Sequence, residues 1–199
     1  MTQRRTQGER SGATRRALLS AARALFGEGG FARTGRDQIA ERAGVTRGAL
    51  YHHFGSKELL FRAVVEDLER EIVDKVATVA ARGSGPAERL QIGALAFLDA
   101  SMERDFRRIV LLDAPSVLGW EEWRAIDAQY GLGMVEAALA EAQQAGLLGP
   151  QPVGPLAHLL LGALNEAALL VATAARPRAA RKEVGATLVG LLDRLLLHG

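Results

Sequence analysis

The 199-residue chain contains no cysteine, and only 5 % of its residues are aromatic. The lack of cysteine excludes disulfides, thiolate catalysis and cysteine-ligated metals. Histidine is also scarce, and the adjacent pair His52-His53 has the wrong spacing for a metal site on a helix. Neighbouring carboxylates such as Glu121 and Glu122 do not face each other on a helix, so they do not form an acid/base pair. We therefore predict no metal, no cofactor and no enzymatic activity.

Long uninterrupted apolar runs and alternating strand patterns are missing as well. The first 16 residues are polar and basic, and no apolar core of a signal peptide follows them. The longest apolar stretch, residues 156–175, is interrupted by His158, Asn165 and Glu166. A buried helix explains this stretch better than a membrane span does. We expect a cytoplasmic protein without a membrane partner.

Apolar residues recur at helical spacing along most of the chain, which predicts an all-α fold of about nine helices. The expected helices cover residues 14–26, 35–43, 47–53, 56–82, 86–102, 105–112, 119–145, 155–175 and 177–197. We expect residues 1–12 to be disordered. Their arginines, Arg4, Arg5 and Arg10, form either a solubilising tail or an arm that lies along DNA.

Residues 34–57 have the pattern of two short helices joined by a tight turn. Thr34 can cap the first helix, with Asp37 as the reciprocal partner, and Gly44 can take the left-handed conformation of the turn. Thr46 can cap the second helix, whose inner face carries Leu50 and Phe54. Its outer face carries Arg47, Gly48, Ala49, Tyr51 and His52. Small residues beside an arginine and a tyrosine suit a helix that enters the DNA major groove.

Charge is divided unevenly along the chain. Residues 1–58 hold 11 Lys or Arg against 5 Asp or Glu, a net charge of +6, whereas the remainder has a net charge of −4. Only the first part therefore suits a polyanion such as DNA.

The first quarter to third of the chain carries a distinctive combination of residues: Gly30-Phe31, Thr34, Ile39-Ala40, Ala43-Gly44-Val45, Leu50-Tyr51, His53-Phe54 and Lys57-Glu58-Leu59-Leu60. Together they resemble the amino-terminal domain of the TetR/AcrR family of transcriptional regulators. It implies a three-helix helix-turn-helix domain at residues 1–58. A helical domain for ligand binding and dimerisation would follow at residues 59–199.

The resemblance also implies which positions contact DNA: Thr34, Arg36, Thr46, Arg47, Gly48, Ala49, Tyr51, His52 and Lys57. Arg47 suits guanine O6 and N7, and Ala49 suits a thymine methyl group. Hydroxyls, ammonium groups and helix amino termini suit phosphates. Arg36 stands where the family often has a small or apolar residue, so a solvated surface role is the alternative for it.

The last two expected helices carry more apolar surface than one intramolecular partner covers. A two-fold interface is the simplest way to bury the excess, and the resemblance points the same way. The residues expected there are Leu156, Leu160, Ala163, Leu164, Ala167, Val171, Leu188, Leu191, Leu192 and Leu195. The alternative for each of them is the protein's own core.

The resemblance also implies a pocket in which a small apolar effector binds. The candidate lining residues are Phe97, Phe106, Trp120, Trp123, Tyr130, Met134 and Asn165. Aromatic residues at helical spacing are more often part of the core, and a buried asparagine is usually just hydrogen-bonded.

We therefore expect a sequence-specific DNA-binding regulator, and a repressor in particular. A homodimer would bind a palindromic double-stranded operator, and a small effector of unknown identity would release it. The helix at residues 56–82 would couple the two domains mechanically. A protein-binding helical adaptor and an enzyme on a regulator-like scaffold are the alternatives.

Overall fold

The computed structural model describes residues 7–196, and this range contains helices and turns but no strand. The helices are α1 (Gln7–Gly29), α2 (Arg36–Arg42), α3 (Arg47–Phe54), α4 (Lys57–Ala80), α5 (Pro86–Ser101), the π-helical η1 (Phe106–Asp113), α6 (Ala114–Val117), α7 (Trp120–Asp127), the π-helical η2 (Ala128–Leu132), α8 (Gly133–Gln144), α9 (Val153–Thr173) and α10 (Pro177–Leu196). Because η1 runs directly into α6, and α7 runs through η2 into α8, the described residues form nine continuous rods. The all-α prediction and the expected number of helices are confirmed.

Two helix boundaries differ from the prediction. Residues 7–12, expected to be disordered, form the start of α1, and Glu9 lies in its first turn, where a carboxylate favours a helix amino terminus. Arg10 is thus part of a helix, whereas Arg4 and Arg5 lie outside the described residues. Pro115 does not end its helical segment, because it lies in the first turn of α6, where a missing N–H costs little.

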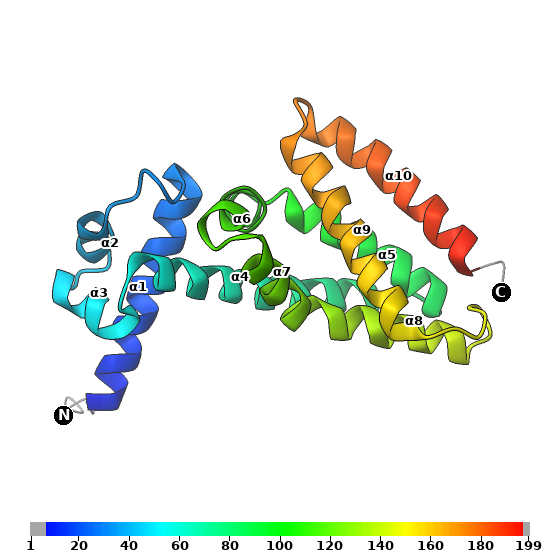
Figure 1. Cartoon of the computed structure of the whole chain (residues 1–199), viewed down its shortest axis with the longest axis horizontal. Helices are drawn as coiled ribbons and strands as arrows, with labels where there is room; N and C mark the ends of the chain where they lie inside the picture. The colour runs from blue at the N-terminus through cyan, green and yellow to red at the C-terminus, as the bar shows by residue number, and fades with distance from the viewer. Residues whose placement is uncertain (1–6, 197–199) are drawn as a thin grey trace.

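The first three helices pack together at one end of the molecule (Figure 1), and their buried side chains join those of α4 in one continuous core. Phe26 of α1 is fully buried, and its ring centroid lies 5.2 Å from that of Phe61 on α4. Phe31, between α1 and α2, completes this aromatic group, with its centroid 5.7 Å from Phe26 and 5.0 Å from Phe61. Edge-on contacts of this kind stabilise aromatic groups beyond the area that they bury.

The long helix α4 leaves this end and runs into the rest of the molecule (Figure 1). Its buried residues recur at helical spacing on one side: Leu60, Val64, Leu68, Ile72 and Val76. Leu59, next to Leu60, is half exposed. The helix therefore contributes buried side chains at both ends of the molecule, as expected of a mechanical connection.

At the other end α4, α5, α8, α9 and α10 pack together as a bundle. α9 is long and apolar enough to cross a membrane by length and composition alone, yet half of its most apolar window is buried inside the protein. It packs against α5, α8 and α10, and this packing accounts for its composition.

The segment η1 lies against α1 and ties the two ends together. The Asp113 carboxylate accepts a hydrogen bond of 2.8 Å from the backbone N–H of Phe31. Gly30 has a φ of 78°, and a Cβ there would lie 2.2 Å from Nη2 of Arg108. The positive φ favours glycine at this position, and any other residue would also have to displace the Arg108 guanidinium.

Candidate nucleic-acid interface and effector cavity

The turn between α2 and α3 has the geometry that the sequence predicts. Gly44 has a φ of 66°, and Val45 donates a backbone hydrogen bond to the carbonyl of Ala40. The Thr46 hydroxyl accepts a hydrogen bond of 3.3 Å from the backbone N–H of Ala49, which caps α3. Leu50 and Phe54 are buried, so the opposite face of α3 is turned outward.

The amino-terminal cap of α2 differs from the prediction. Gly35 is the capping residue, and its backbone N–H donates a hydrogen bond of 2.8 Å to the side-chain oxygen of Gln38. Thr34 and Asp37 were expected in these roles. Thr34 is buried, and its hydroxyl donates to the carbonyls of Gly30 and Leu25. The prediction that the Thr34 hydroxyl contacts a phosphate is therefore wrong. The hydroxyl is bonded inside the protein to carbonyls at the end of α1 and just after it.

Lys57 also has internal partners. Its ammonium donates hydrogen bonds of 3.1 Å each to the carbonyls of Phe31 and Thr34, and it lies 3.9 Å from the centroid of the Phe31 ring. An ammonium group has three donors, so one remains for a phosphate. Lys57 thus holds the segment that leads into α2 against the start of α4.

The outward face of α2 and α3 carries a connected polar group. Arg36 donates a hydrogen bond of 2.6 Å to the Tyr51 phenol, and its guanidinium lies over the Tyr51 ring. Arg47 lies on the same face, with its Nε 3.4 Å from Oδ1 of Asp37. Hydrogen bonding to Tyr51 and the nearby Asp37 charge raise the pKa of the Arg47 guanidinium. These contacts are solvent-exposed, so they exchange readily for contacts to a ligand.

The other residues expected at DNA lie around this group. Gly48 and His52 are exposed, and Ala49 is half-buried. A shallow depression lies between the segment before α2 and the starts of α3 and α4, and its charged lining residues are Arg33, Arg36, Arg47 and Lys57 with Asp37 and Glu58. Guanidinium groups around a depression of this kind suit phosphate and base edges. The face contains no bulky side chain at Gly48, so a second backbone can approach α3 closely.

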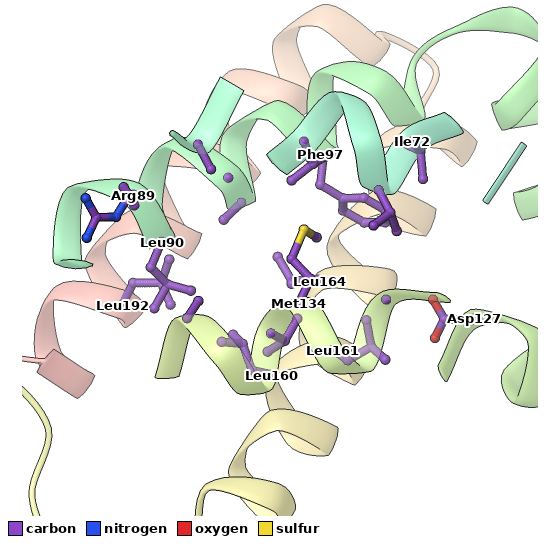
Figure 2. Close-up of a pocket in the computed structure, with 18 of the residues that line it drawn as sticks. Ile72, Arg89, Leu90, Phe97, Asp127, Met134, Leu160, Leu161, Leu164 and Leu192 are labelled. Atoms are coloured by element: carbon purple, nitrogen blue, oxygen red, sulfur yellow. The ribbon is translucent and has the colours of Figure 1, made fainter. Parts of the chain in front are cut away.

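A cavity of about 80 Å³ lies in the bundle at the far end of α4. Figure 2 shows Asp127 at one end and Arg89 with Leu90 and Leu192 at the other, with Phe97 and Met134 between them. The lining comes from six helices (α4, α5, α7, α8, α9 and α10) and η2: Glu69, Ile72, Val73, Val76, Ala80, Arg89, Leu90, Gly93, Ala94, Phe97, Asp127, Gly131, Met134, Val135, Ala138, Leu160, Leu161, Leu164 and Leu192. An apolar cavity with few polar groups is the usual form of a small-molecule site.

Two carboxyl groups line this otherwise apolar space, Glu69 from α4 and Asp127 from the end of α7. Burial and the nearby Asp127 charge raise the pKa of Glu69 to about 8. Burial also raises the pKa of Asp127 to about 6, against the opposing effects of a hydrogen bond from Asn165 and of the Arg124 charge. The Asn165 amide donates at 2.7 Å, and the Arg124 guanidinium at 2.8 Å, to the same Asp127 oxygen.

Of the seven residues predicted to line a pocket, only Phe97 and Met134 line the cavity. Asn165 does not line the cavity itself, but its side-chain amide donates a hydrogen bond to Asp127, which does. Phe106 and Trp123 are buried in the core, and Tyr130 lies nearer the surface with its phenol bonded to Arg70. Trp120 is 61 % exposed and is therefore not a pocket residue.

The residues predicted at a dimer interface fall into two groups. Six of them are buried inside the single chain, because α9 and α10 pack against α5 and α8 on that side: Leu160, Leu164, Ala167, Val171, Leu188 and Leu192. The prediction for these six is corrected, and three of them line the cavity. Leu156 and Leu195 are half-buried, whereas Ala163 and Leu191 are exposed. Leu159 and Leu170, which the prediction missed, are more exposed than Leu191, the most exposed leucine of the predicted set.

Both parts of the chain match family models. Residues 18–64 match the model described as bacterial regulatory proteins of the tetR family, and residues 87–195 match that of a tetracyclin repressor-like C-terminal domain. The chain belongs to the TetR family of transcriptional regulators. This family consists of DNA-binding regulators rather than enzymes, and α2 and α3 are the helix-turn-helix of its DNA-binding domain.

Individual relatives agree with this assignment. A crystal structure of a TetR-family regulator from Pectobacterium atrosepticum is 32 % identical, covers 97 % of this chain and 98 % of that one, and has a TM-score of 0.85. The Tn10 TetC protein of Escherichia coli is 28 % identical over 81 % of this chain and 82 % of its own length. RolR in complex with resorcinol has the same fold, with 18 % identity, a TM-score of 0.74 and 97 % coverage of both chains.

The two cavity carboxyls are the functional candidates that sequence reasoning missed. Glu69 lies at helical spacing from Val65, Ile72 and Val76, all of which are buried. A charged residue inside an apolar helical stripe is a detectable signal, because such a group is rarely buried without a partner. Asp127 gives a weaker signal, since it lies among polar residues of a mixed segment.

Proposed function

We propose that this TetR-family protein is a repressor that binds a palindromic operator as a homodimer and leaves it when a small molecule enters the bundle cavity. The observation that carries the proposal is the outward face of α3, where Gly48 and Tyr51 are exposed beside Arg47. A helix with small and hydrogen-bonding residues on its free face fits the major groove, with Arg47 at a guanine. Arg36, Thr46 and His52 would contact the flanking phosphates.

A dimer follows from the exposed apolar face of α9 and α10. Leu159, Leu170 and Leu191 are 73 %, 52 % and 48 % exposed, and Ala163 lies on the same side of α9 as Leu159 and Leu170. An isologous contact between two such faces buries them without leaving an open end. Two copies of α3 about 34 Å apart would then bind successive major grooves of an inverted repeat.

The cavity is the proposed effector site because it lies against α4, which continues into the DNA-binding end. An effector shifts DNA binding only by its differential affinity for the two arrangements of α4. RolR, which shares the fold, is described in complex with resorcinol, a small aromatic molecule. Binding to chromosomal operators would place the protein in the cytoplasm.

Selection of bound DNA from a random pool tests the DNA-binding part of the proposal. We expect an inverted repeat whose half-sites lie about one helical turn apart. Binding should weaken with salt, with a log–log slope of roughly −0.9 per phosphate neutralised. A protein-binding adaptor would enrich no sequence, and that result would reject the regulator in favour of the adaptor.

Light scattering at micromolar protein tests the dimer. The parent should have twice the mass of one chain, and Leu159→Glu should be monomeric because it places a charge in the apolar contact. Leu59→Glu makes the same change at an exposed leucine of α4 and should leave the mass unchanged. A monomeric parent would remove the dimer from the proposal.

A reporter gene under the selected sequence distinguishes repression from activation. Deletion of the regulator should raise expression from that promoter if the protein is a repressor. Lower expression after deletion would identify an activator and reject the proposed direction of control.

A further inference from the structure

Glu69 is a buried carboxyl group whose place in the structure none of the contacts described above explains. It is 4 % exposed, it lines the cavity, and no hydrogen bond or ion pair to it is found among residues 7–196. A buried carboxyl without a partner is costly, whichever protonation state it adopts. A ligand that supplies the missing partner would recover this cost.

The surroundings of Glu69 define the charge of that ligand. On α7, Asp127 is paired with Arg124, so its negative charge is already balanced. On α4, the neighbouring Arg70 is exposed and bonded to Asp67 and Tyr130 rather than to Glu69. Asn165 of α9 donates to Asp127 and carries no charge. An ionised Glu69 would therefore leave one uncompensated negative charge at this end of the cavity.

The opposite end does not favour an anion. Among residues 7–196, Arg89 of α5 is the only basic residue that lines the cavity. Its guanidinium forms an ion pair with Glu141 of α8 and a hydrogen bond with the carbonyl of Gly83. An anionic ligand would have to displace Glu141 there and would also face the two carboxyls at the other end.

We propose that the effector of this cavity is a small aliphatic amine, bound as its cation with the ammonium group at Glu69 and Asp127. The alkyl part would lie along Phe97, Met134 and Leu164 toward Arg89, in the apolar space of Figure 2. The α4 lining from Glu69 to Ala80 extends over roughly 16 Å, at about 1.5 Å of rise per residue. A cavity of about 80 Å³ with this length suits a slim chain better than a fused ring system. This inference rests on the proposed function only in treating the cavity as the effector site.

Charge balance predicts a proton release on binding. With its pKa raised to about 8, Glu69 is protonated at pH 7 in the empty cavity. The alkylammonium ion brings its own three protons, so formation of the ion pair sends the Glu69 proton to solvent. Asp127 faces the same space, and its ion pair with Arg124 is retained. Between pH 6 and pH 7 the amine should bind about tenfold more tightly, and the gain should level off as the pH passes 8, because Glu69 is then already ionised in the empty cavity.

Isothermal titration calorimetry of the full chain, without DNA, tests the inference. The probes are hexylamine, hexan-1-ol and hexanoate, which have the same chain length and different charge. At pH 7 we expect hexylamine to bind at least roughly tenfold more tightly than hexan-1-ol, and hexanoate to bind most weakly. Titrations in buffers of different ionisation enthalpy should show about one proton released per hexylamine and none for hexan-1-ol.

The variant Glu69→Gln keeps the size of the side chain and removes the charge. It should bind hexan-1-ol as the parent does, lose the preference for hexylamine, and release no proton. Glu121→Gln, the same change at an exposed position of α7, should behave as the parent. Thermal unfolding of each variant confirms that it is folded before the titrations are compared.

Three results would overturn the inference: no binding of hexylamine at millimolar concentration, binding no tighter than that of hexan-1-ol, or a preference that persists in Glu69→Gln. Each leaves sequence-specific DNA binding intact. Conversely, hexylamine could bind with proton release and yet not weaken operator binding. That result would support the amine-binding site and reject the proposal that a ligand in this cavity releases the operator. The two proposals therefore fail separately.

Discussion

The DNA-binding end and the cavity end of this protein use polar groups in opposite ways. At the first, Arg36, Arg47 and Tyr51 are exposed, and their mutual contacts compete with water. At the second, Glu69 and Asp127 are enclosed by apolar helices. Exposed charges cost little and exchange partners easily, whereas buried charges are costly and restrict what binds beside them. The first arrangement suits reversible contact with a long polyanion, and the second suits selection of one small molecule.

The largest expected effect tests whether the two ends fold as one unit. Phe61→Ala removes a fully buried ring of α4 that packs against Phe26 and Phe31. We expect the free energy of unfolding to fall by about 3–5 kcal/mol, measured by urea denaturation. Leu59→Ala, at a half-exposed position two residues away, is the control and should change stability far less. A transition split into two steps would show that the ends unfold independently.

The next prediction tests whether ionisation of Glu69 in the cavity lowers the free energy of unfolding. Because the folded-state pKa of Glu69 is raised from 4.5 to about 8, its contribution to stability is complete below pH 4.5 and is lost as the pH rises through 8. Asp127 contributes in the same direction, between its ordinary pKa of 3.8 and about 6. Urea denaturation at pH 6 and pH 8.5 measures this loss.

Glu69→Gln should lose roughly 2–3 kcal/mol less than the parent between pH 6 and pH 8.5. The exposed change Glu121→Gln should follow the parent at both pH values. An equally steep loss in Glu69→Gln would assign the pH dependence to another group and weaken the contrast between the two ends.

At the exposed end, Arg47→Ala should weaken binding to the selected operator roughly tenfold to a hundredfold and relax the preference at one base pair. The reason is that a guanidinium bonded to guanine cannot be replaced by a methyl group. Arg178→Ala, the same change at an exposed position of α10, should leave the affinity unchanged. Gel-shift titrations on the selected site and its single-base variants measure both. Unaltered selectivity in Arg47→Ala would exclude this arginine from base recognition.

The smallest effect concerns the contact that joins the ends. Asp113→Ala removes the acceptor of the Phe31 N–H and a partner of Arg108, and should cost about 1–2 kcal/mol. Amide hydrogen exchange should show faster exchange of the Phe31 N–H. Asp74→Ala, at an exposed position of α4, should not alter that rate. Unchanged exchange in Asp113→Ala would mean that η1 does not hold this loop.

The sequence predicts the DNA-binding end well because its geometry is local. The capping of α3 by Thr46, the turn at Gly44 and the inward positions of Leu50 and Phe54 follow from spacing within 24 residues. The error at Thr34 has a non-local cause. Its hydroxyl is turned inward by carbonyls at the end of α1, and no spacing within the motif reveals them. The proposed division at residue 58 also stays a prediction, since α4 crosses it without a break.

The cavity end was predictable only as a bundle of helices. Its cavity is formed where six helices and η2 fail to fill the space between them, and that depends on packing rather than on any one pattern. The same limit explains the errors on α9 and α10. Leu160 and Leu159 are adjacent and equally apolar, yet one is buried and the other is the most exposed leucine of the helix. Which face of an apolar helix is free depends on its neighbours.

The position of Lys57 has a consequence for how movement reaches an operator. Its ammonium binds two carbonyls of the loop before α2, while its backbone begins α4. A change in the tilt of α4 would therefore move α2 and α3 with it as one rigid body. In the proposed dimer, regulation would then change the distance between the two copies of α3. The contacts of each α3 with its own base pairs would stay the same.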